Sequence, residues 1–600
     1  MKKSARRFLA MLLVGIMIIG CFAGCAKETE QEPVAETTKP AESTEKAEST
    51  ETEEEKSIHP VTTEPITISI LTQRHSNATN NAEDIWFFNY LEYWLAEEYG
   101  YNITLDVQQS EEASEQISLM LGTDSLPDLV WSIDLSPNNT VIYGDGQGLV
   151  MDWTPYLNDE YMPHVSALLE ADQDALNAST SIDGKIYSIP KMASRAYGNA
   201  SSTIGVMDRL FVNTTWLKEC GLEMPTNIDE FLDMLRTFKS QMKLESGEEV
   251  IPALSNADFL DKAIWLMMGY YGSSLSKYGN EFCIKDGKLA YPVYSEDYKT
   301  YIDIMKTMYE EGLISQDYFS MDGTTMRGLT QAGVAGVISD WTLGSTADYM
   351  EWESIPWFTI GDNDQVVVST GSTFNTGQLW ASSRTEYPEV VALIVDYLYS
   401  PEGTVAYTYG PQEGQDPLGM VDGWYIGEDG KITTKMVEDG VYDNIELWAY
   451  QYIRSHDDVG YRTEALEYAY EEAGQTLDVK EYELLDTITN KTFIAKEYNV
   501  YTHDDAQGHW FITNTEASLP YITQVRLPAV YQTEDEALRA QELVTVLKNH
   551  ISSESAKFIT GVRPVGEIDQ FFEELESMGI EEYIALYEKA YSSYLSMYFD

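Results

Sequence analysis

Cysteine is scarce in this chain of 600 residues. There are four cysteines, at positions 21, 25, 220 and 283. Four cysteines are too few for a fold held together by disulfides, and their positions form no paired CxxC motif of the kind that binds zinc. Cys220 and Cys283 are compatible both with a disulfide and with two free thiols.

Positive charge is scarce as well. Against 99 Asp and Glu residues there are only 38 Lys and Arg, which gives a formal net charge of −61 at pH 7. A surface of this sign repels phosphate backbones and anionic lipid head groups, so we expect no nucleic acid partner. Acidity of this size mostly serves solubility.

Recognisable catalytic signatures are missing. The sequence contains no HExxH, GxSxG or Walker A motif, and the glycines at 144–148 have the wrong spacing for a dinucleotide loop. Carboxylate pairs suitable for a glycosidase can be drawn, but 99 acidic residues make chance pairs certain. The remaining metal candidates are His503 with His509 and the acidic loop at 361–364. We expect no enzyme activity, no metal and no cofactor.

The leader has an apolar run too short to span a membrane comfortably. Four basic residues among the first seven precede about a dozen apolar residues, from Phe8 to Ile19, which is typical of an export signal. Both Cys21 and Cys25 follow small residues, as in a lipobox, whose cysteine is acylated and becomes the mature N-terminus. We expect lipid attachment at Cys25 (or Cys21) after a signal peptide at 1–25; plain secretion with structural cysteines is the alternative.

The next segment, 26–60, is predicted to be a disordered acidic tether. It consists mainly of Glu, Thr, Ser, Ala, Pro and Lys, and such a composition buries too little apolar surface to offset the entropy of ordering. A lipid at one end of this tether places the folded part at the extracellular face of the cell membrane, without entering it.

Strands and helices then alternate. Period-2 strands are predicted at 66–71 and 103–107 with a short strand at 127–131, and helices at about 80–100, with a capping-box-like start, and 111–122. This alternation favours a mostly parallel sheet, in which ligands lie beyond the carboxyl ends of the strands. The residues at those ends are Gln73, Arg74, His75, Trp131, Ser132 and Asp134.

A hairpin separates this block from a second one. Asp183 and Gly184 predict a type I′ turn, followed by a strand that ends at Pro190. The alternation restarts at 210–213, and the C-terminal region is helical at 533–553, 566–578 and 580–597. We expect the first part of lobe 1 at 61–190, the first part of lobe 2 at 191–365, a return to lobe 1 at 366–400, and interlobe and C-terminal helical segments, mainly in lobe 2, at 401–600.

Short motifs occur along the chain in the order of a known family. They include the lipobox and the segments at 122–130, 148–153, 183–190, 212–222, 409–414 and 557–561. As a set they resemble the family 1 extracellular solute-binding proteins of ABC importers, in particular the long LipO-like and oligosaccharide-binding lipoproteins. The chain departs from the family at Asn213, Thr214 and Thr215 and over 422–475.

The resemblance implies an α/β, two-lobed periplasmic-binding-protein-like fold of type II, with a hinge and a ligand cleft between the lobes. It implies a monomeric receptor that captures a carbohydrate, most simply an oligosaccharide, and hands it to an ABC permease. The plentiful aromatic residues, 41 Tyr and 13 Trp, suit such a ligand. Two alternatives stay open: a secreted glycoside-active enzyme, and a ligand-sensing receptor for a membrane kinase.

Ligand binding is assigned to six residues: Trp131, Asp134, Arg195, Asp340, Trp341 and Glu413. The resemblance suggests the two tryptophans as stacking rings, one per lobe, and the two aspartates would accept hydroxyl hydrogen bonds nearby. The arginine would bind a carboxylate if the ligand is acidic, and the glutamate lies in a family-like segment expected near the cleft. The alternatives are packed core or hinge for the rings, and solvated loops, caps or turns for the charged residues.

Overall fold

The computed structural model describes residues 64–598 apart from short segments, and all of the described residues belong to one unit, Ser57–Asp600. The segments left out are 193–208, 245–246, 248, 256–258, 273–276, 340–345, 347, 364–365, 370–373, 443, 458–459, 461, 478, 487–490, 499–508, 510–511, 514–516 and 524–526. The predicted signal peptide, Cys21, Cys25 and the tether up to residue 63 therefore lie outside the described residues. Within the described part, no helix is both long and apolar enough to cross a membrane.

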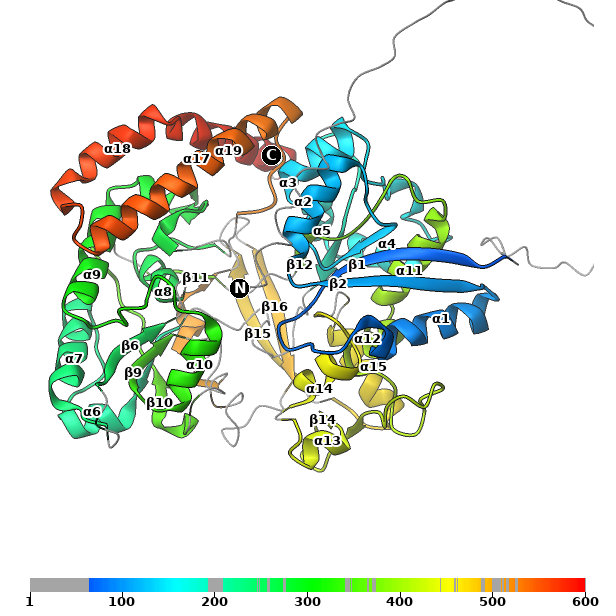
Figure 1. Cartoon of the computed structure of the whole chain (residues 1–600), viewed down its shortest axis with the longest axis horizontal. Helices are drawn as coiled ribbons and strands as arrows, with labels where there is room; N and C mark the ends of the chain where they lie inside the picture. The colour runs from blue at the N-terminus through cyan, green and yellow to red at the C-terminus, as the bar shows by residue number, and fades with distance from the viewer. Residues whose placement is uncertain are drawn as a thin grey trace, which may run out of the picture. The chain divides into compact units, whose positions relative to one another are not determined.

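The first lobe is built on a five-stranded sheet with the order β2-β1-β3-β12-β4. Its strands are β1 (Ile66–Gln73), β2 (Ile103–Ser110), β3 (Leu129–Trp131), β4 (Ile189–Met192) and β12 (Phe374–Ala381). β1 runs parallel to β2 and β3, whereas β12 runs antiparallel to β3 and β4. The helices of this lobe in chain order are α1 (Trp86–Tyr99), α2 (Ala113–Thr123), α4 (Pro163–Ala171), α5 (Gln173–Ser179) and α11 (Pro388–Tyr399) (Figure 1).

Helix α1 ends where the sequence predicts and begins where it does not. Its apolar residues Phe87, Leu91 and Leu95 recur at helical spacing and are fully buried. Gly100 ends it in the left-handed conformation, with φ of 67°. The predicted capping-box-like start is wrong, because the residue before the helix is Ile85 and it makes no side-chain capping bond.

The Asp183-Gly184 turn also differs from the prediction. Gly184 has φ of 80°, but Asp183 does not have the positive φ that a type I′ turn requires at both positions. The Gly184 amide donates to the Ser181 carbonyl, and the Ser181 amide donates to the Lys185 carbonyl. Strand β4 begins at Ile189 rather than ending at 190, because a proline without an N–H is tolerated on an edge strand.

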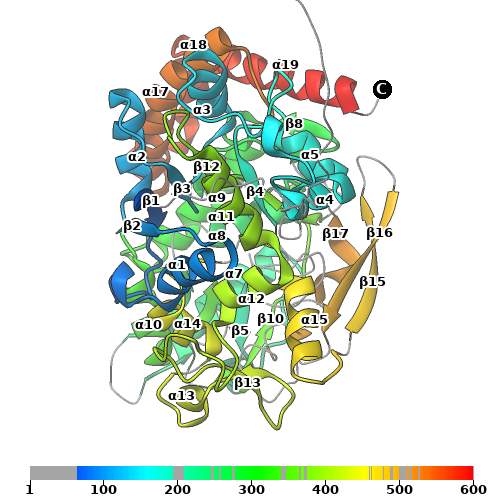
Figure 2. The ribbon, with the colours of Figure 1, turned by 90° about the vertical axis from the view of Figure 1, so that its right-hand side faces the viewer.

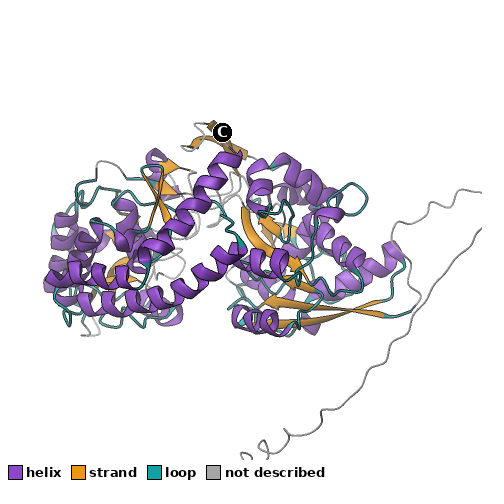
Figure 3. Cartoon of the chain, turned by 90° about the horizontal axis from the view of Figure 1, so that it is seen from above, coloured by secondary structure: helices purple, strands orange, loops and turns teal. Residues whose placement is uncertain are grey.

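The second lobe is built on a four-stranded sheet with the order β10-β5-β9-β6. Its strands are β5 (Phe211–Asn213), β6 (Ile251–Ser255), β9 (Ala335–Ser339) and β10 (Trp352–Ser354). Helices α6 (Thr214–Cys220), α7 (Ile228–Gln241), α8 (Phe259–Met267) and α9 (Asp297–Glu310) belong to this lobe, and Figure 3 shows helices packed around the strands of both sheets.

Local structure accounts for the residue type at two positions of this lobe, Asn213 and Gly336. Asn213 starts α6, because its side chain accepts a hydrogen bond from the Trp216 amide. Gly336 lies in β9, where a Cβ atom would stand within 3 Å of the rings of Phe238 and Trp216. Close packing against these two rings therefore requires glycine at this position of β9. Cys220 and Cys283 are both free thiols.

The segment after α11 packs differently from the prediction. Helices α12 (Pro401–Tyr409) and α14 (Ile445–Tyr452) contribute to the core of the first lobe, whereas the prediction for 401–600 was interlobe and C-terminal helical segments, mainly in lobe 2. The reason is the short connection: Ser400 alone separates α11 from α12, and its side chain caps α12 by accepting from the Gly403 amide. Figure 2 shows α12 beside α1, and the rings of Phe87 and Tyr407 lie 4.9 Å apart.

The remaining described strands form two-stranded pairs. They are β7 (Cys283–Lys285) with β8 (Lys288–Ala290), β11 (Val368–Ser369) with β17 (Ile522–Thr523), β13 (Tyr425–Ile426) with β14 (Ile432–Thr433), and β15 (Val479–Asp486) with β16 (Lys491–Tyr498). Helix α15 (Arg462–Glu472) packs against α12 in a small apolar cluster of its own.

Three C-terminal helices follow: α17 (Glu534–Ile559), α18 (Ile568–Ser577) and α19 (Ile580–Tyr598). A capping box between Thr533 and Glu536 starts α17. Its buried apolar residues join the core of the second lobe, and in Figure 1 the helices, orange to red, lie above α9. The same helix also contacts the first lobe, because Gln541 donates to Asn139 over 2.9 Å.

Candidate ligand-binding site

Polar side chains from distant parts of the chain meet at one edge of the first sheet. The carboxyl ends of β1, β3 and β4 share this edge, because β1 and β3 are parallel and β4 is antiparallel to β12. We define the strand-end cluster by the residues in contact there: His75, Lys191, Tyr450, Arg454, His456 and Asp457. Asp134 follows β3 at the same edge.

His75 connects β1 to the end of α14. Its amide donates to the Ser455 carbonyl over 2.8 Å, and its ring stacks on Tyr450 with the two centroids 3.9 Å apart. Nδ1 accepts from the Asn77 amide over 3.1 Å, so the neutral ring carries its proton on Nε2. Burial lowers the pKa of this imidazole, which keeps it neutral at pH 7.

Asp457 is the negative centre of the cluster. It accepts a hydrogen bond from the Tyr450 hydroxyl, and Lys191 Nζ lies 3.4 Å from its Oδ2. Burial opposes ionisation of this carboxyl, but Lys191, Arg454 and His456 outweigh it and hold the pKa well below the usual range. The carboxylate is therefore ionised throughout the physiological range, although its side chain remains 42% exposed.

Arg454 and His456 are the remaining residues of the cluster. The Arg454 side chain is fully buried, pairs with Glu446, and holds its guanidinium carbon 4.8 Å from the Tyr450 ring centroid. His456 meets the His75 ring edge-on at 5.8 Å. Burial lowers the pKa of His456 to about 4, so both imidazoles are uncharged at pH 7.

Asp134 is held in a tight, strained turn after β3. Ser132 has φ of 57°, and its amide donates to the Gln378 carbonyl over 2.8 Å. A Cβ atom at Gly377 would stand 2.6 Å from both Asp134 Oδ1 and the Leu135 carbonyl, so this approach requires glycine.

Asp134 is exposed at the surface, but neighbouring protein atoms reduce the hydration of its carboxyl group. The resulting desolvation raises its pKa to about 6, against a hydrogen bond with Gln378 that lowers the pKa. A carboxyl that is both accessible and partly desolvated suits contact with a ligand hydroxyl.

The other predicted site residues are placed as follows. Trp131 is fully buried, and its ring packs against Phe87, Phe88 and Tyr407 at 5.0 to 6.0 Å. In this conformation no face of the ring is open to a ligand, because β3 is a central strand covered on both sides. Glu413 is exposed on a surface turn, where its amide donates to the Trp424 carbonyl. Arg195, Asp340 and Trp341 lie outside the described residues.

The family assignment follows from a comparison with known proteins. The model of the family described as bacterial extracellular solute-binding protein matches residues 82–405, more than half of the chain. The chain belongs to this family. The fructooligosaccharide ABC transporter substrate-binding protein FusA of Streptococcus pneumoniae is 23% identical over 510 residues, 83% of this solute-binding protein and 86% of FusA. Lipoprotein LipO of Bacillus subtilis is 27% identical over 212 residues, 34% of this chain and 37% of LipO.

The fold is shared with a solved structure. FusA of S. pneumoniae in complex with kestose matches with a TM-score of 0.67 and 18% identity, covering 89% of this solute-binding protein and 100% of that chain. The predicted type II fold of two α/β lobes is therefore confirmed.

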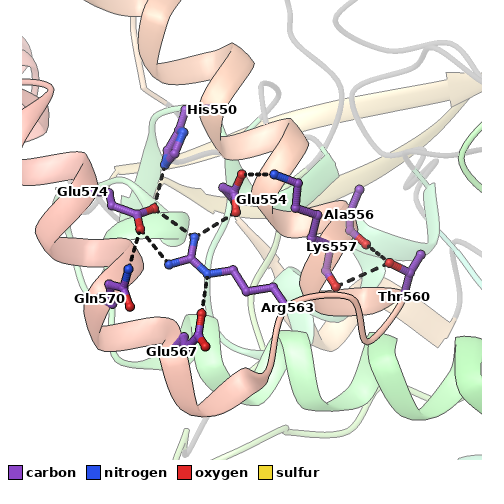
Figure 4. A network of polar contacts seen from close by, with 9 residues as sticks. All are labelled: His550, Glu554, Ala556, Lys557, Thr560, Arg563, Glu567, Gln570 and Glu574. Carbon is purple, nitrogen blue, oxygen red and sulfur yellow. Dashed lines mark hydrogen bonds and ion pairs between the residues drawn. The ribbon is translucent and has the colours of Figure 1, made fainter.

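A separate surface cavity of about 480 Å³ lies between α17 and α18, away from the strand ends. Arg563 lies at its base and pairs with Glu554, Glu567 and Glu574, and His550 also contacts Glu574 (Figure 4). These opposite charges pair with one another and connect α17 to α18. No ligand is needed to balance the charges that line the cavity.

Sequence reasoning missed most of the strand-end cluster. Tyr450, Arg454, His456 and Asp457 belong to the region 422–475, whose Gly, Tyr and Asp content gave no clear pattern. The available signal was the polar run from Arg454 to Asp457 directly after an apolar helical stretch.

Proposed function

We propose that this solute-binding protein captures an oligosaccharide between its lobes and delivers it to the permease of an ABC importer. The observation that carries the proposal is the cluster of His75, Tyr450 and Asp457 at the carboxyl ends of parallel strands, where α/β folds bind ligands, with Asp134 following β3 at the same edge. The name of the relative FusA, which specifies fructooligosaccharides, supports a ligand of this class.

The chemistry of this edge suits sugar hydroxyls. Asp134 and Asp457 supply carboxylate acceptors, whose hydrogen bonds are stronger than those of neutral groups. His75 supplies an N–H donor, since its Nδ1 is engaged by Asn77. We propose that Arg195, Asp340 and Trp341 complete the site, with Arg195 donating hydrogen bonds to ligand hydroxyls rather than pairing with a carboxylate; Trp131 and Glu413 would contribute only after a rearrangement of their surroundings.

Binding would act through closure of the two lobes. The ligand stabilises the closed state over the open one, and the permease can recognise the closed surface. We propose that the protein works as a monomer without catalysis, held at the extracellular face of the membrane by a lipid on Cys25 (or Cys21) alone.

Thermal unfolding of the chain from residue 26 onward, which leaves out the predicted lipid-bearing cysteines, against a panel of oligosaccharides tests this proposal. A ligand at a hundred times its Kd adds about 2.7 kcal/mol to the free energy of unfolding by mass action. A stabilising sugar that is recovered intact is the expected result. A sugar that is cleaved would identify an enzyme instead, and a panel without any stabilising sugar would refute oligosaccharide capture.

A further inference from the structure

The cations of the strand-end cluster are already matched by carboxylates of the protein. Lys191 Nζ lies 3.4 Å from Asp457, and the fully buried Arg454 pairs with Glu446. A ligand carboxylate would have to displace one of these partners and leave it without its cation, which is costly at a partly desolvated site. Neither cation is therefore presented to a ligand.

The two imidazoles add no positive charge. The His75 ring accepts from the Asn77 amide and stacks flat on Tyr450, while His456 lies edge-on beside it. Both are held neutral at pH 7 by burial. They offer hydrogen bonds to hydroxyl groups, but no charge to an anion.

Arg74 also follows β1, but it lies on the side of that strand away from β3. Its guanidinium donates to the side chain of Gln109 on β2 over 3.0 Å. Since β3 and β4 lie on the other side of β1, the Arg74 guanidinium lies at the β2 end of this edge rather than beside Asp134 and Lys191.

Among the described residues that follow β3, the exposed charge is that of Asp134, which is negative. Asp134 is accessible, and a ligand carboxylate beside it would raise the pKa of both groups by like-charge repulsion. The net charge of −61 adds a long-range field that disfavours the approach of anions. Carboxylate acceptors beside neutral donors match a ligand whose polar groups are hydroxyls.

We infer that this chain selects neutral oligosaccharides and rejects those that carry uronate or other anionic groups. The inference rests on the proposed function and narrows it to a charge class. It rests on the described residues of the site. Lys191 and Arg454 are paired with carboxylates of the protein, and Asp134 is exposed; both features disfavour an anionic ligand.

The test is a calorimetric titration of the mature chain with matched pairs of ligands. Neutral fructo-, gluco- and galacto-oligosaccharides of three to five units identify a ligand class, and oligogalacturonates are compared with their C6-reduced forms, which differ only in the carboxylate. We expect a neutral ligand to bind at least tenfold more tightly than any acidic one, with an affinity that changes little between 50 and 500 mM salt.

The possible results distinguish a failure of charge selection from a failure of oligosaccharide capture. Acidic oligosaccharides that bind as tightly as neutral ones, or more tightly, would leave oligosaccharide capture standing and overturn charge selection. No binding by either class would overturn the proposed function, and the charge selection with it.

Discussion

The ring of His75 lies flat on the ring of Tyr450, with centroids 3.9 Å apart and planes inclined by 2°. His75 follows the first strand of the sheet, and Tyr450 lies in the last turn of a helix, α14, that the sequence pattern did not reveal. The contact fixes the orientation of the imidazole and brings the Tyr450 hydroxyl to Asp457. It is the contact on which the geometry of the proposed site depends.

Tyr450→Phe is expected to weaken ligand binding while the fold is kept. The variant preserves the stack with His75 but removes the hydroxyl that orients Asp457. Loss of one such hydrogen bond corresponds to about 1 kcal/mol, or roughly fivefold in Kd. The matched control is Tyr452→Phe, whose hydroxyl contacts only Tyr442 in the described structure. Equal Kd values for the two variants, measured by calorimetry, would contradict the role of Tyr450.

Ligand affinity should fall as the pH is lowered through about 6. Desolvation raises the pKa of Asp134 to about 6 in the folded protein, so the carboxylate acceptor is lost by protonation in that range. Because the folded-state pKa is raised, Asp134 destabilises the free protein at pH 7, and this cost is relieved as the pH falls. Asp134→Asn should therefore abolish the pH step in Kd and raise, not lower, the Tm of the free protein at pH 7. An unchanged pH profile in the variant would exclude Asp134 from the site.

Gly377→Ala should cost far more than Gly184→Ala. The two glycines have nearly the same positive φ, 79° and 80°, so the backbone strain is matched. A Cβ atom at Gly377 meets Asp134 Oδ1 and Leu135 at 2.6 Å, whereas a Cβ atom at Gly184 meets nothing within 4 Å. We expect about 1 kcal/mol of destabilisation for Gly184→Ala and 2 kcal/mol or more, with weaker ligand binding, for Gly377→Ala. Denaturant unfolding of both variants measures the difference, and similar midpoints would show that the close contact relaxes.

Arg563→Ala should destabilise the C-terminal helices without changing ligand affinity. Its side chain is 8% exposed and pairs with both Glu554 and Glu574, so its removal leaves Glu554 with Lys557 and Glu574 with His550, at a cost of about 2 kcal/mol for the lost charged hydrogen bonds. Arg539→Ala on α17 is the control, because Arg539 is 43% exposed and its pairs with Glu542 and Glu582 are worth less than about 1 kcal/mol.

The same network gives a pH dependence. Hydrogen bonds from Lys557 and Arg563 lower the pKa of Glu554 against the effect of burial, and hydrogen bonds from Arg563 are the largest influence lowering the pKa of Glu574. The stability they contribute is full above the ordinary pKa of about 4.3 for a glutamate and is lost as the pH falls below it. The decline in Tm on acidification should therefore be shallower in Arg563→Ala than in the parent. Parallel profiles would show that the network does not contribute.

Much of the lobe architecture could be predicted from the sequence, because alternating strands and helices specify a parallel sheet and thereby one edge for ligands. That reasoning put His75 and Asp134 at the edge where the structure has them. It could not assign Trp131, because a three-residue strand carries no periodicity and does not reveal that both of its faces are covered.

Tyr450 and Asp457 were beyond prediction for a different reason. They approach the sheet edge only because α12 stays with α11, and that follows from the one-residue connection at Ser400 rather than from any local pattern near residue 450. Contacts between residues so far apart in the chain are set by tertiary packing.

Amide hydrogen exchange of the mature chain, with and without a saturating neutral oligosaccharide, tests most directly whether the strand ends bind the ligand. The account predicts slower exchange around residues 73–78, 132–135 and 450–457, with little change at 550–574 around the charged cavity. Protection confined to 550–574, or no protection at the three strand-end segments despite binding, would contradict it.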